Sequence, residues 1–203
     1  MRWHVFKEAE QLNIHREKAG KDINDVLSCA RDAVFTTGAS VAVVGGAARD
    51  MALGGAPRDI DLMICPKNED DVYVLLSALD IYLGYKITAD YRYDEDTGRM
   101  QNHATEADPY DIMVQDNRIL RVVKLSCLGS LDVDVLVSSN STIRDAVERF
   151  DYNINMFIIR RHTTAPLYIG TTIGVLHRNL QASITADRAN HIKHIATAYN
   201  WSI

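Results

Sequence analysis

The chain has 203 residues, of which 47% are hydrophobic and 24% are charged, and a formal net charge of −5, as is ordinary for a globular domain. The acidic balance argues against a broad basic face for sequence-independent nucleic-acid binding, although it leaves room for a local basic groove. No apolar run reaches the length of a membrane span, the polar N-terminus is unlike a secretory signal, and three separated cysteines indicate buried thiols in a reducing cytoplasm.

The first part of the chain has the pattern of a helical arm followed by a strand and a second helix. Residues 3–35 carry apolar side chains at helical spacings among charged ones, with a break expected at Gly20. Residues 41–44 form a short apolar run, as in a buried strand, and residues 46–53 predict a helix that ends at a glycine pair.

A second strand, a third helix and a polar segment follow. Residues 60–65 alternate acidic and aliphatic side chains, as expected of a strand with one polar face. Asn68 is a suitable N-cap for a helix over 69–83, and Gly84 provides its C-terminal stop. Residues 86–116 are polar and contain eight acidic residues and three tyrosines, which is typical of a functional loop or an insertion in a compact domain.

The last part of the chain predicts a hairpin, another strand and further helices. The hairpin strands are 112–115 and 119–127, and LDVDVLV at 131–137 is the next strand. Residues 171–203 are expected to be mostly helical. Together these elements predict an α/β fold with a small mixed β-sheet and helical extensions at both ends.

The whole chain, 1–203, is predicted to be a single domain. A helical arm (1–40) precedes a core (41–165) that contains the polar insertion 86–116, and a helical extension (166–203) follows.

The stretch 41–65 combines a strand, a double glycine, an Arg-Asp pair, a glycine turn and an Asp-x-Asp sequence. Glycines allow backbone N–H groups to approach a phosphate closely. Alternate residues of a strand share a face, so Asp59 and Asp61 point the same way, roughly 6–7 Å apart along the strand. Two carboxylates beside a phosphate loop are the ligands that a pair of divalent metal ions requires.

The strand at 131–137 repeats this pattern, with Asp132 and Asp134 on one face and three valines on the other. If the two acidic strands are neighbours, three or four carboxylates converge, and such a cluster is electrostatically poor unless cations fill it. The alternative is an acidic, solvent-facing side of an edge strand.

The motif GGAARDMALGGAPRDIDL resembles the head-domain signature of the class II CCA-adding enzymes and bacterial poly(A) polymerases, members of the DNA polymerase β-like nucleotidyltransferase superfamily. The family pattern is a double glycine, two residues, Arg-Asp, a glycine turn, and a basic residue before Asp-x-Asp. The matching residues are Gly45, Gly46, Arg49, Asp50, Gly54, Arg58, Asp59 and Asp61.

The segment RFDYNIN is similar to a second family motif, Arg-Arg-Asp-Phe-Thr-x-Asn, which helps to bind the ribose and the triphosphate. Arg149, Asp151 and Asn155 match it, and Phe150 replaces its second arginine. The C-terminal sequence weakly resembles the helix that leaves the family's catalytic head, with Arg188 at a basic position. The family's base-reading motif and tRNA-gripping body have no counterpart in this sequence.

The resemblance implies metal-dependent transfer of NMP from an NTP to a hydroxyl, with release of pyrophosphate. It implies two Mg²⁺ ions, or Mn²⁺, held by Asp59, Asp61 and a third carboxylate, for which Asp134 is favoured because an apolar run follows it and Asp132 is the alternative. The NTP would contact Gly45, Gly46, Arg49, Arg58, Arg149, Asp151 and Asn155.

The acceptor stays open between three partners: an RNA 3′ end such as that of tRNA, which the resemblance favours, a protein side chain, or a small molecule. A non-catalytic regulatory protein with a nucleotide pocket is a further alternative. Such a protein would normally lose a metal carboxylate, whereas Asp59 and Asp61 are both present.

Overall fold

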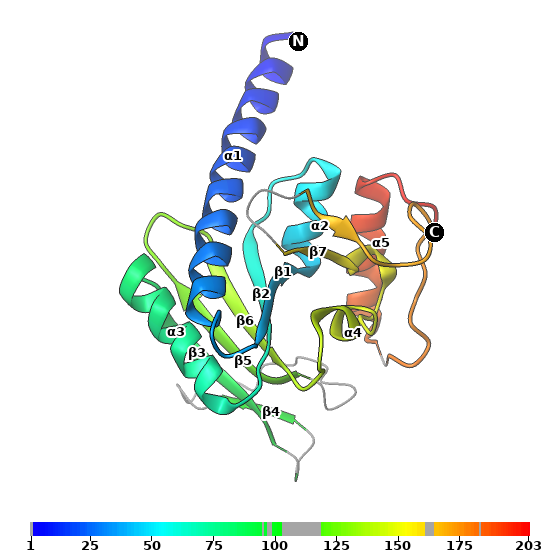
Figure 1. Ribbon diagram of the computed structural model, residues 1–203. Coiled ribbons are helices and arrows are strands. Elements are labelled where there is room, and N and C mark those ends of the chain that lie inside the picture. The colour runs from blue at the N-terminus through cyan, green and yellow to red at the C-terminus, as the bar shows by residue number, and fades with distance from the viewer. Residues whose placement is uncertain (1, 95, 97–98, 103–118, 161–164, 183) are drawn as a thin grey trace.

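The computed structural model describes residues 2–94, 96, 99–102, 119–160, 165–182 and 184–203, without the side chains of 2–9 and 99. The helices are α1 (Arg2–Ala33), α2 (Gly45–Leu53), α3 (Glu69–Leu83), α4 (Ile143–Val147) and α5 (Ala186–Ala198), with the short 3-10 helix η1 (Asn153–Asn155) (Figure 1). The strands are β1 (Ser40–Val44), β2 (Asp59–Cys65), β3 (Lys86–Asp94), β4 (Arg99–Asn102), β5 (Ile119–Ser126), β6 (Asp132–Ser138), β7 (Phe157–Ile159) and β8 (Leu167–Tyr168).

The described strands form one eight-stranded sheet with the order β4-β3-β5-β6-β2-β1-β7-β8. Strands β2 and β6 run parallel, and the other neighbouring pairs are antiparallel. The sheet is therefore mixed, which confirms the predicted α/β fold class with helices at both ends of the chain.

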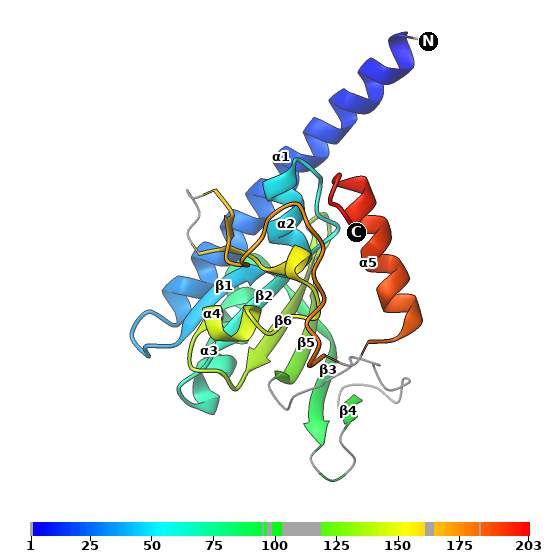
Figure 2. The ribbon, with the colours of Figure 1, turned by 90° about the vertical axis from the view of Figure 1, so that its right-hand side faces the viewer.

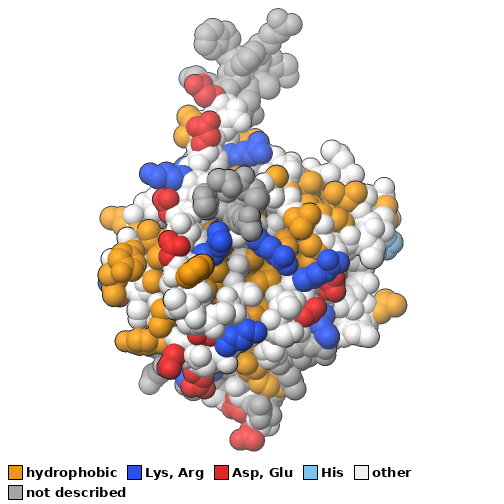
Figure 3. Space-filling view, viewed as in Figure 1, with side chains coloured by type: hydrophobic (Ala, Val, Ile, Leu, Met, Phe, Trp, Pro, Cys, Tyr) orange, Lys and Arg blue, Asp and Glu red, His pale blue; other side chains and the backbone are white. Residues whose placement is uncertain are grey.

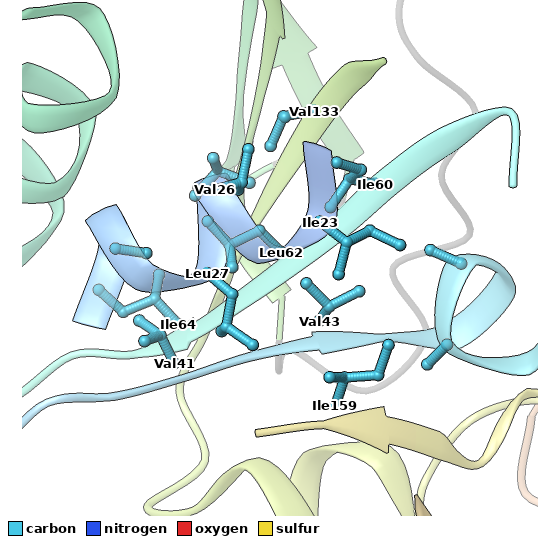
Figure 4. Close-up of a cluster of buried hydrophobic side chains, with 14 of the residues drawn as sticks. Ile23, Val26, Leu27, Val41, Val43, Ile60, Leu62, Ile64, Val133 and Ile159 are labelled. Carbon is cyan, nitrogen blue, oxygen red and sulfur yellow. The ribbon is translucent and has the colours of Figure 1, made fainter. Parts of the chain in front are cut away.

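Helices α1 and α3 cover one face of the sheet. Figure 4 shows Ile23 and Leu27 of α1 packed over Val43 of β1 and Leu62 of β2, all in one buried cluster. Burying an Ile or Leu side chain contributes roughly 1.5–3 kcal/mol, so this layer fixes the face to which each residue of β2 points. The aliphatic residues of β2 face α1, and its acidic residues face the other way.

Helix α4 covers part of the opposite face. Met63 and Cys65, in the second half of β2, pack with Ile143 and Val147 of α4 in a second buried cluster. The acidic first half of β2 lies outside this cluster. Helix α5 stands beside α2, as Figures 1 and 2 both show.

The caps of two helices match the sequence prediction. Asn68 accepts a hydrogen bond from the backbone N–H of Asp71, whose side chain accepts in return, so α3 begins with a capping box. Gly84 ends α3 with a φ of 75°, and Gly54 ends α2 with a φ of 84°. The lengths of α2 and α3 are thus set by local chain chemistry.

Three expectations need correction. Helix α1 runs without a break through Gly20, where a Cβ would lie 3.3 Å from the Cε atom of Met51, so this glycine allows close packing against α2. Within the predicted polar insertion, Lys86–Asp94 and Arg99–Asn102 are strands β3 and β4. In the predicted helical extension, 166–203, only α5 is helical among the described residues.

The predicted hairpin strand 112–115 lies outside the described residues, whereas its partner is strand β5 as predicted. No helix in the described part of the chain combines the length and apolar character needed to cross a lipid bilayer.

Candidate active site

The two acidic strands are neighbours in the sheet. In the parallel register of β2 and β6, Asp59 pairs with Asp132 and Asp61 pairs with Asp134. Neighbouring strands lie about 4.8 Å apart and alternate residues share a face, so four aspartates occupy one face at one end of the two strands. The carboxylates of the two strands therefore converge, as the sequence predicted for the case that the strands are neighbours.

The carboxylates of this group perturb one another. Asp59 is exposed at the start of β2, and the partial burial of its carboxyl, followed by the charge of Asp134, raises its pKa. Burial, followed by the charges of Asp59 and Asp134, raises the pKa of Asp61 to about 7, against smaller lowering effects of the Gly46 N–H and Arg49. Asp61 therefore carries a charge that the metal-free chain compensates poorly.

Asp134 has a cation beside it. The Nζ atom of Lys124 on β5 lies 2.7 Å from Oδ2 of Asp134, and their side chains are 30% and 16% exposed. Asp132 is exposed at the start of β6. Of the two candidates for the third carboxylate, Asp134 is the one in register with Asp61.

The double glycine lies against Asp61. Gly45 has a φ of 63°, and a Cβ there would lie 3.0 Å from Oδ2 of Asp61. The backbone N–H of Gly46, in the first turn of α2, donates to the same oxygen at 3.3 Å. Glycine is thus required both by the backbone conformation and by the close approach, and the helix N-terminus favours an anion there.

Arg49 connects α2 with η1. Its guanidinium is buried; it donates to Oδ1 of Asp50 and to Oδ1 of Asn155, the latter at 2.8 Å. The hydroxyl of Tyr199, after α5, donates to the same Asp50 oxygen at 3.0 Å. The Arg-Asp pair of the first motif therefore ties the second motif and the C-terminal segment to α2.

A side chain of α5 contacts the second motif, RFDYNIN. Arg188 donates through Nε to Oδ2 of Asp151 at 2.7 Å, and Nδ2 of Asn155 donates to Oδ1 of Asp151 at 3.4 Å. Asp151 and Asn155 are thus adjacent, whereas the side chain of Arg149 is exposed.

Basic side chains lie near His191 on α5. Burial, followed by the charges of Arg188, Arg58 and Arg49, lowers the pKa of His191 on α5. Arg58, immediately before Asp59, is exposed. Arg49 and Arg188 already pair with Asp50 and Asp151, whereas Arg58 places an exposed positive charge next to the acidic group, where it could meet a phosphate.

Two site residues, Lys124 and Tyr199, were not identified from the sequence. The only signal for Lys124 was its place on the predicted strand 119–127, since its partner depends on the register with β6. No local pattern marks Tyr199, which meets Asp50 across 149 residues of chain.

No group of three or more His, Cys, Asp or Glu side chains, among those the structure describes, already has an arrangement that could hold a metal ion. The donor chemistry nevertheless suits magnesium, because Asp59, Asp61 and Asp134 supply carboxylate oxygens from adjacent strands. The ammonium at Asp134 stands where a positive charge is needed.

No family model matches the chain, and no curated protein matches it. Solved structures do. A CCA-adding enzyme with CTP aligns at a TM-score of 0.47 and 20% identity, over 82% of this chain and 31% of its own. The Thermotoga maritima CCA-adding enzyme with tRNA aligns at 0.49 and 18% identity, over 76% of this chain and 32% of its own.

The Bacillus stearothermophilus CCA-adding enzyme with CTP aligns at a TM-score of 0.43 and 13% identity, over 81% of this chain and 33% of its own. The chain thus spans about a third of the length of the solved structures it matches. All three of these solved structures are CCA-adding enzymes.

Proposed function

We propose that this chain is a DNA polymerase β-like nucleotidyltransferase, which moves NMP from an NTP to a hydroxyl acceptor and releases pyrophosphate. The observation that carries the proposal is the parallel pairing of β2 and β6, which sets Asp61 beside Asp134. The N-terminus of α2 lies at the same point, where the Gly46 N–H donates to Asp61, and an N-terminus of this kind is suited to a phosphate.

Asp59, Asp61 and Asp134 would hold two Mg²⁺ ions, or Mn²⁺ in their place, with Asp132 as the alternative third ligand. When bound, the ions would lower the pKa of the attacking hydroxyl and neutralise charge that develops on the phosphoryl group. The raised pKa values of Asp59 and Asp61 support this assignment, because their charges cost free energy until a cation compensates them.

In the proposed reaction the acceptor oxygen attacks the α-phosphorus in line, and the bond from that phosphorus to the bridging oxygen breaks. Pyrophosphate leaves with the bridging oxygen, and Asp134 helps to remove the hydroxyl proton. The N–H groups of Gly45 and Gly46 would face the phosphates, and the exposed side chains of Arg58 and Arg149 would clamp them.

Asp151 and Asn155 would orient the ribose, because Arg188 and Arg49 hold their side chains in place. Arg49 was expected to clamp the triphosphate. Its guanidinium donates to Asp50 and Asn155, so contact with a phosphate would require these hydrogen bonds to rearrange.

The acceptor that we propose is an RNA 3′ end, such as that of tRNA. The motif resemblance supports it, and the exposed Arg58 beside Asp59 offers a positive charge to a phosphate.

The test is transfer of label from α-³²P-labelled NTPs to total RNA, total protein or small hydroxyl compounds, with Mg²⁺ or Mn²⁺. We expect labelled RNA with the native chain and none with Asp59→Asn or Asp61→Asn. Asp70→Asn, which neutralises an exposed carboxylate at the start of α3, is the matched control and should transfer normally.

Label on protein or on a small molecule would replace the RNA acceptor and keep the transferase. If no product is labelled and no pyrophosphate is released, the transferase proposal is wrong. Asp132→Asn and Asp134→Asn, made singly, identify the third ligand, since only the ligand's replacement should abolish transfer.

A further inference from the structure

Lys124 lies within the carboxylate group that we assign to metal binding. In the antiparallel register of β5 and β6 it stands directly opposite Asp134, and Asp134 stands beside Asp61 on the next strand. The Nζ atom is 2.7 Å from Oδ2 of Asp134, within an ion pair whose two side chains are less than one-third exposed. The third carboxylate of the proposed site already has a cation of the protein's own.

The lysine ammonium and a divalent metal ion bind a carboxylate oxygen by different interactions. A lysine ammonium binds carboxylate oxygens through its N–H donors, whereas Mg²⁺ and Mn²⁺ take the oxygen lone pairs into a coordination shell. Like charges brought to one carboxylate also repel each other. A metal ion that recruits Asp134 must therefore displace Lys124 or bind without that oxygen.

We propose that Lys124 is a positioning residue that competes with a divalent metal ion for Asp134, so that the carboxylate joins the metal site only when its ammonium is displaced. This inference rests on the proposed function, because it takes Asp134 as a metal ligand. The triphosphate of an incoming NTP supplies the anion to which the displaced ammonium can turn. Nucleotide and metal binding are then coupled, each strengthening the other.

The ion pair gives a measurable consequence for the chain without nucleotide. Removing the ammonium frees Asp134 for the metal, so Mn²⁺ affinity should rise. A partly buried pair of this kind is worth about one tenfold factor in an equilibrium constant. The rise should disappear when Asp134 can no longer bind a metal.

The experiment measures Mn²⁺ dissociation constants by electron paramagnetic resonance, without NTP, for the native chain, Lys124→Met and Lys124→Gln. The glutamine variant keeps a polar end on the side chain in case the methionine variant folds poorly. Lys86→Met is the matched control, because it removes the same charge from an exposed lysine that pairs with Asp80 instead. All are repeated in an Asp134→Asn background.

We expect about tenfold tighter Mn²⁺ binding for both Lys124 variants, no change for Lys86→Met, and no effect of Lys124 when Asp134 is asparagine. Equal or weaker binding after loss of Lys124, or the same gain in the Asp134→Asn background, overturns the inference. If this happens while the native chain still transfers NMP, the inference alone fails. If the expected pattern appears without any transfer, the inference stands and the proposed function fails.

Discussion

Replacing Asp61 by Asn should stabilise the metal-free chain at pH 8. The pKa of Asp61 is raised from its ordinary value of 3.8 to about 7, first by burial and then by Asp59 and Asp134. A folded state that binds the proton more tightly than the unfolded chain loses stability as the pH rises from the lower value through the higher one. At pH 8 the ionised carboxylate therefore lowers the free energy of unfolding, and asparagine removes that charge.

The size of the effect follows from the two pKa values. At about 1.4 kcal/mol per pH unit, the interval between them corresponds to about 4 kcal/mol. Asp61 keeps partial solvent access, which screens its neighbours' charges, so we expect ~1–2 kcal/mol. For a chain of this length such a gain raises the melting temperature by roughly 2–8 °C.

The assay is thermal or urea unfolding in EDTA at pH 4 and pH 8. Asp61→Asn should exceed the native chain in stability at pH 8 and lose this advantage at pH 4, where the native carboxyl is protonated in the folded state. Asp132→Asn, at an exposed position of β6, is the control and should change little. If Asp61→Asn is no more stable than the native chain at pH 8, the electrostatic account of the site is wrong.

Three other changes test the packing around the site and elsewhere in the sheet. Gly45→Ala should destabilise more than Gly38→Ala in urea unfolding: both glycines have positive φ (63° and 77°), but only at Gly45 would a Cβ meet a carboxylate oxygen, at 3.0 Å. The shared backbone cost is ~1–2 kcal/mol, and equal losses would contradict the steric argument. Tyr199→Phe loses the hydroxyl that donates to α2 and should cost ~1 kcal/mol; an unchanged urea midpoint would show that this contact contributes nothing. Arg121→Met should destabilise at pH 7 and much less at pH 3. Burial raises the pKa of Asp90, but the hydrogen bonds and charge of Arg121 outweigh it and lower the pKa, so this stabilisation is lost as the pH falls below about 4. A pH-independent difference would refute that linkage.

Elements whose signals are local could be predicted well from the sequence. Helix α3 begins after Asn68 and ends before Gly84 as expected, because both caps act within a few residues of the helix ends. The shared face of Asp59 and Asp61 follows from strand periodicity alone. The hydrophobic layer under α1 then fixes which face that is.

The polar segment after Gly84 was misjudged because its apolar residues are few and face a small cluster. Tyr91 of β3 and Met100 of β4 pack with Val122 of β5, while much of the rest of the hairpin is exposed. A hairpin with one small buried face has the composition of a loop. The pairing partner, not the segment's own sequence, makes it a strand.

Residues 171–182 form no helix, and a side chain from another segment binds the backbone of residues 172–177. Nδ2 of Asn153 donates to the carbonyl oxygens of Thr172 and Val175, and its Oδ1 accepts from the N–H of His177. These hydrogen bonds replace those of a helix. The interactions of Lys124 with Asp134 and of Tyr199 with Asp50 are likewise set by the tertiary structure, and no local sequence pattern indicates them.

A different surface feature lies away from the site. Exposed hydrophobic side chains gather on the left of Figure 3, the side on which α3 lies in Figure 1. Tyr73, Ile81 and Tyr82 of α3 are each more than 70% exposed. The outer face of α3 is therefore apolar, although its inner face already packs into the core.

The sheet contains two kinds of acidic side chain, Asp90 on β3 and the pair Asp59 and Asp61 on β2, and their pKa values are shifted in opposite directions. Asp90 is buried, yet Arg121 and Arg92 lower its pKa, so its charge is compensated and stabilises the fold near neutral pH. Asp59 and Asp61 are shifted the opposite way, and their nearest acidic neighbours add to the shift. Selection for stability alone would compensate or remove such charges. Under the proposed function, divalent ions would bring the positive charge that Arg58, Lys124 and Arg49 supply only in part to this cluster.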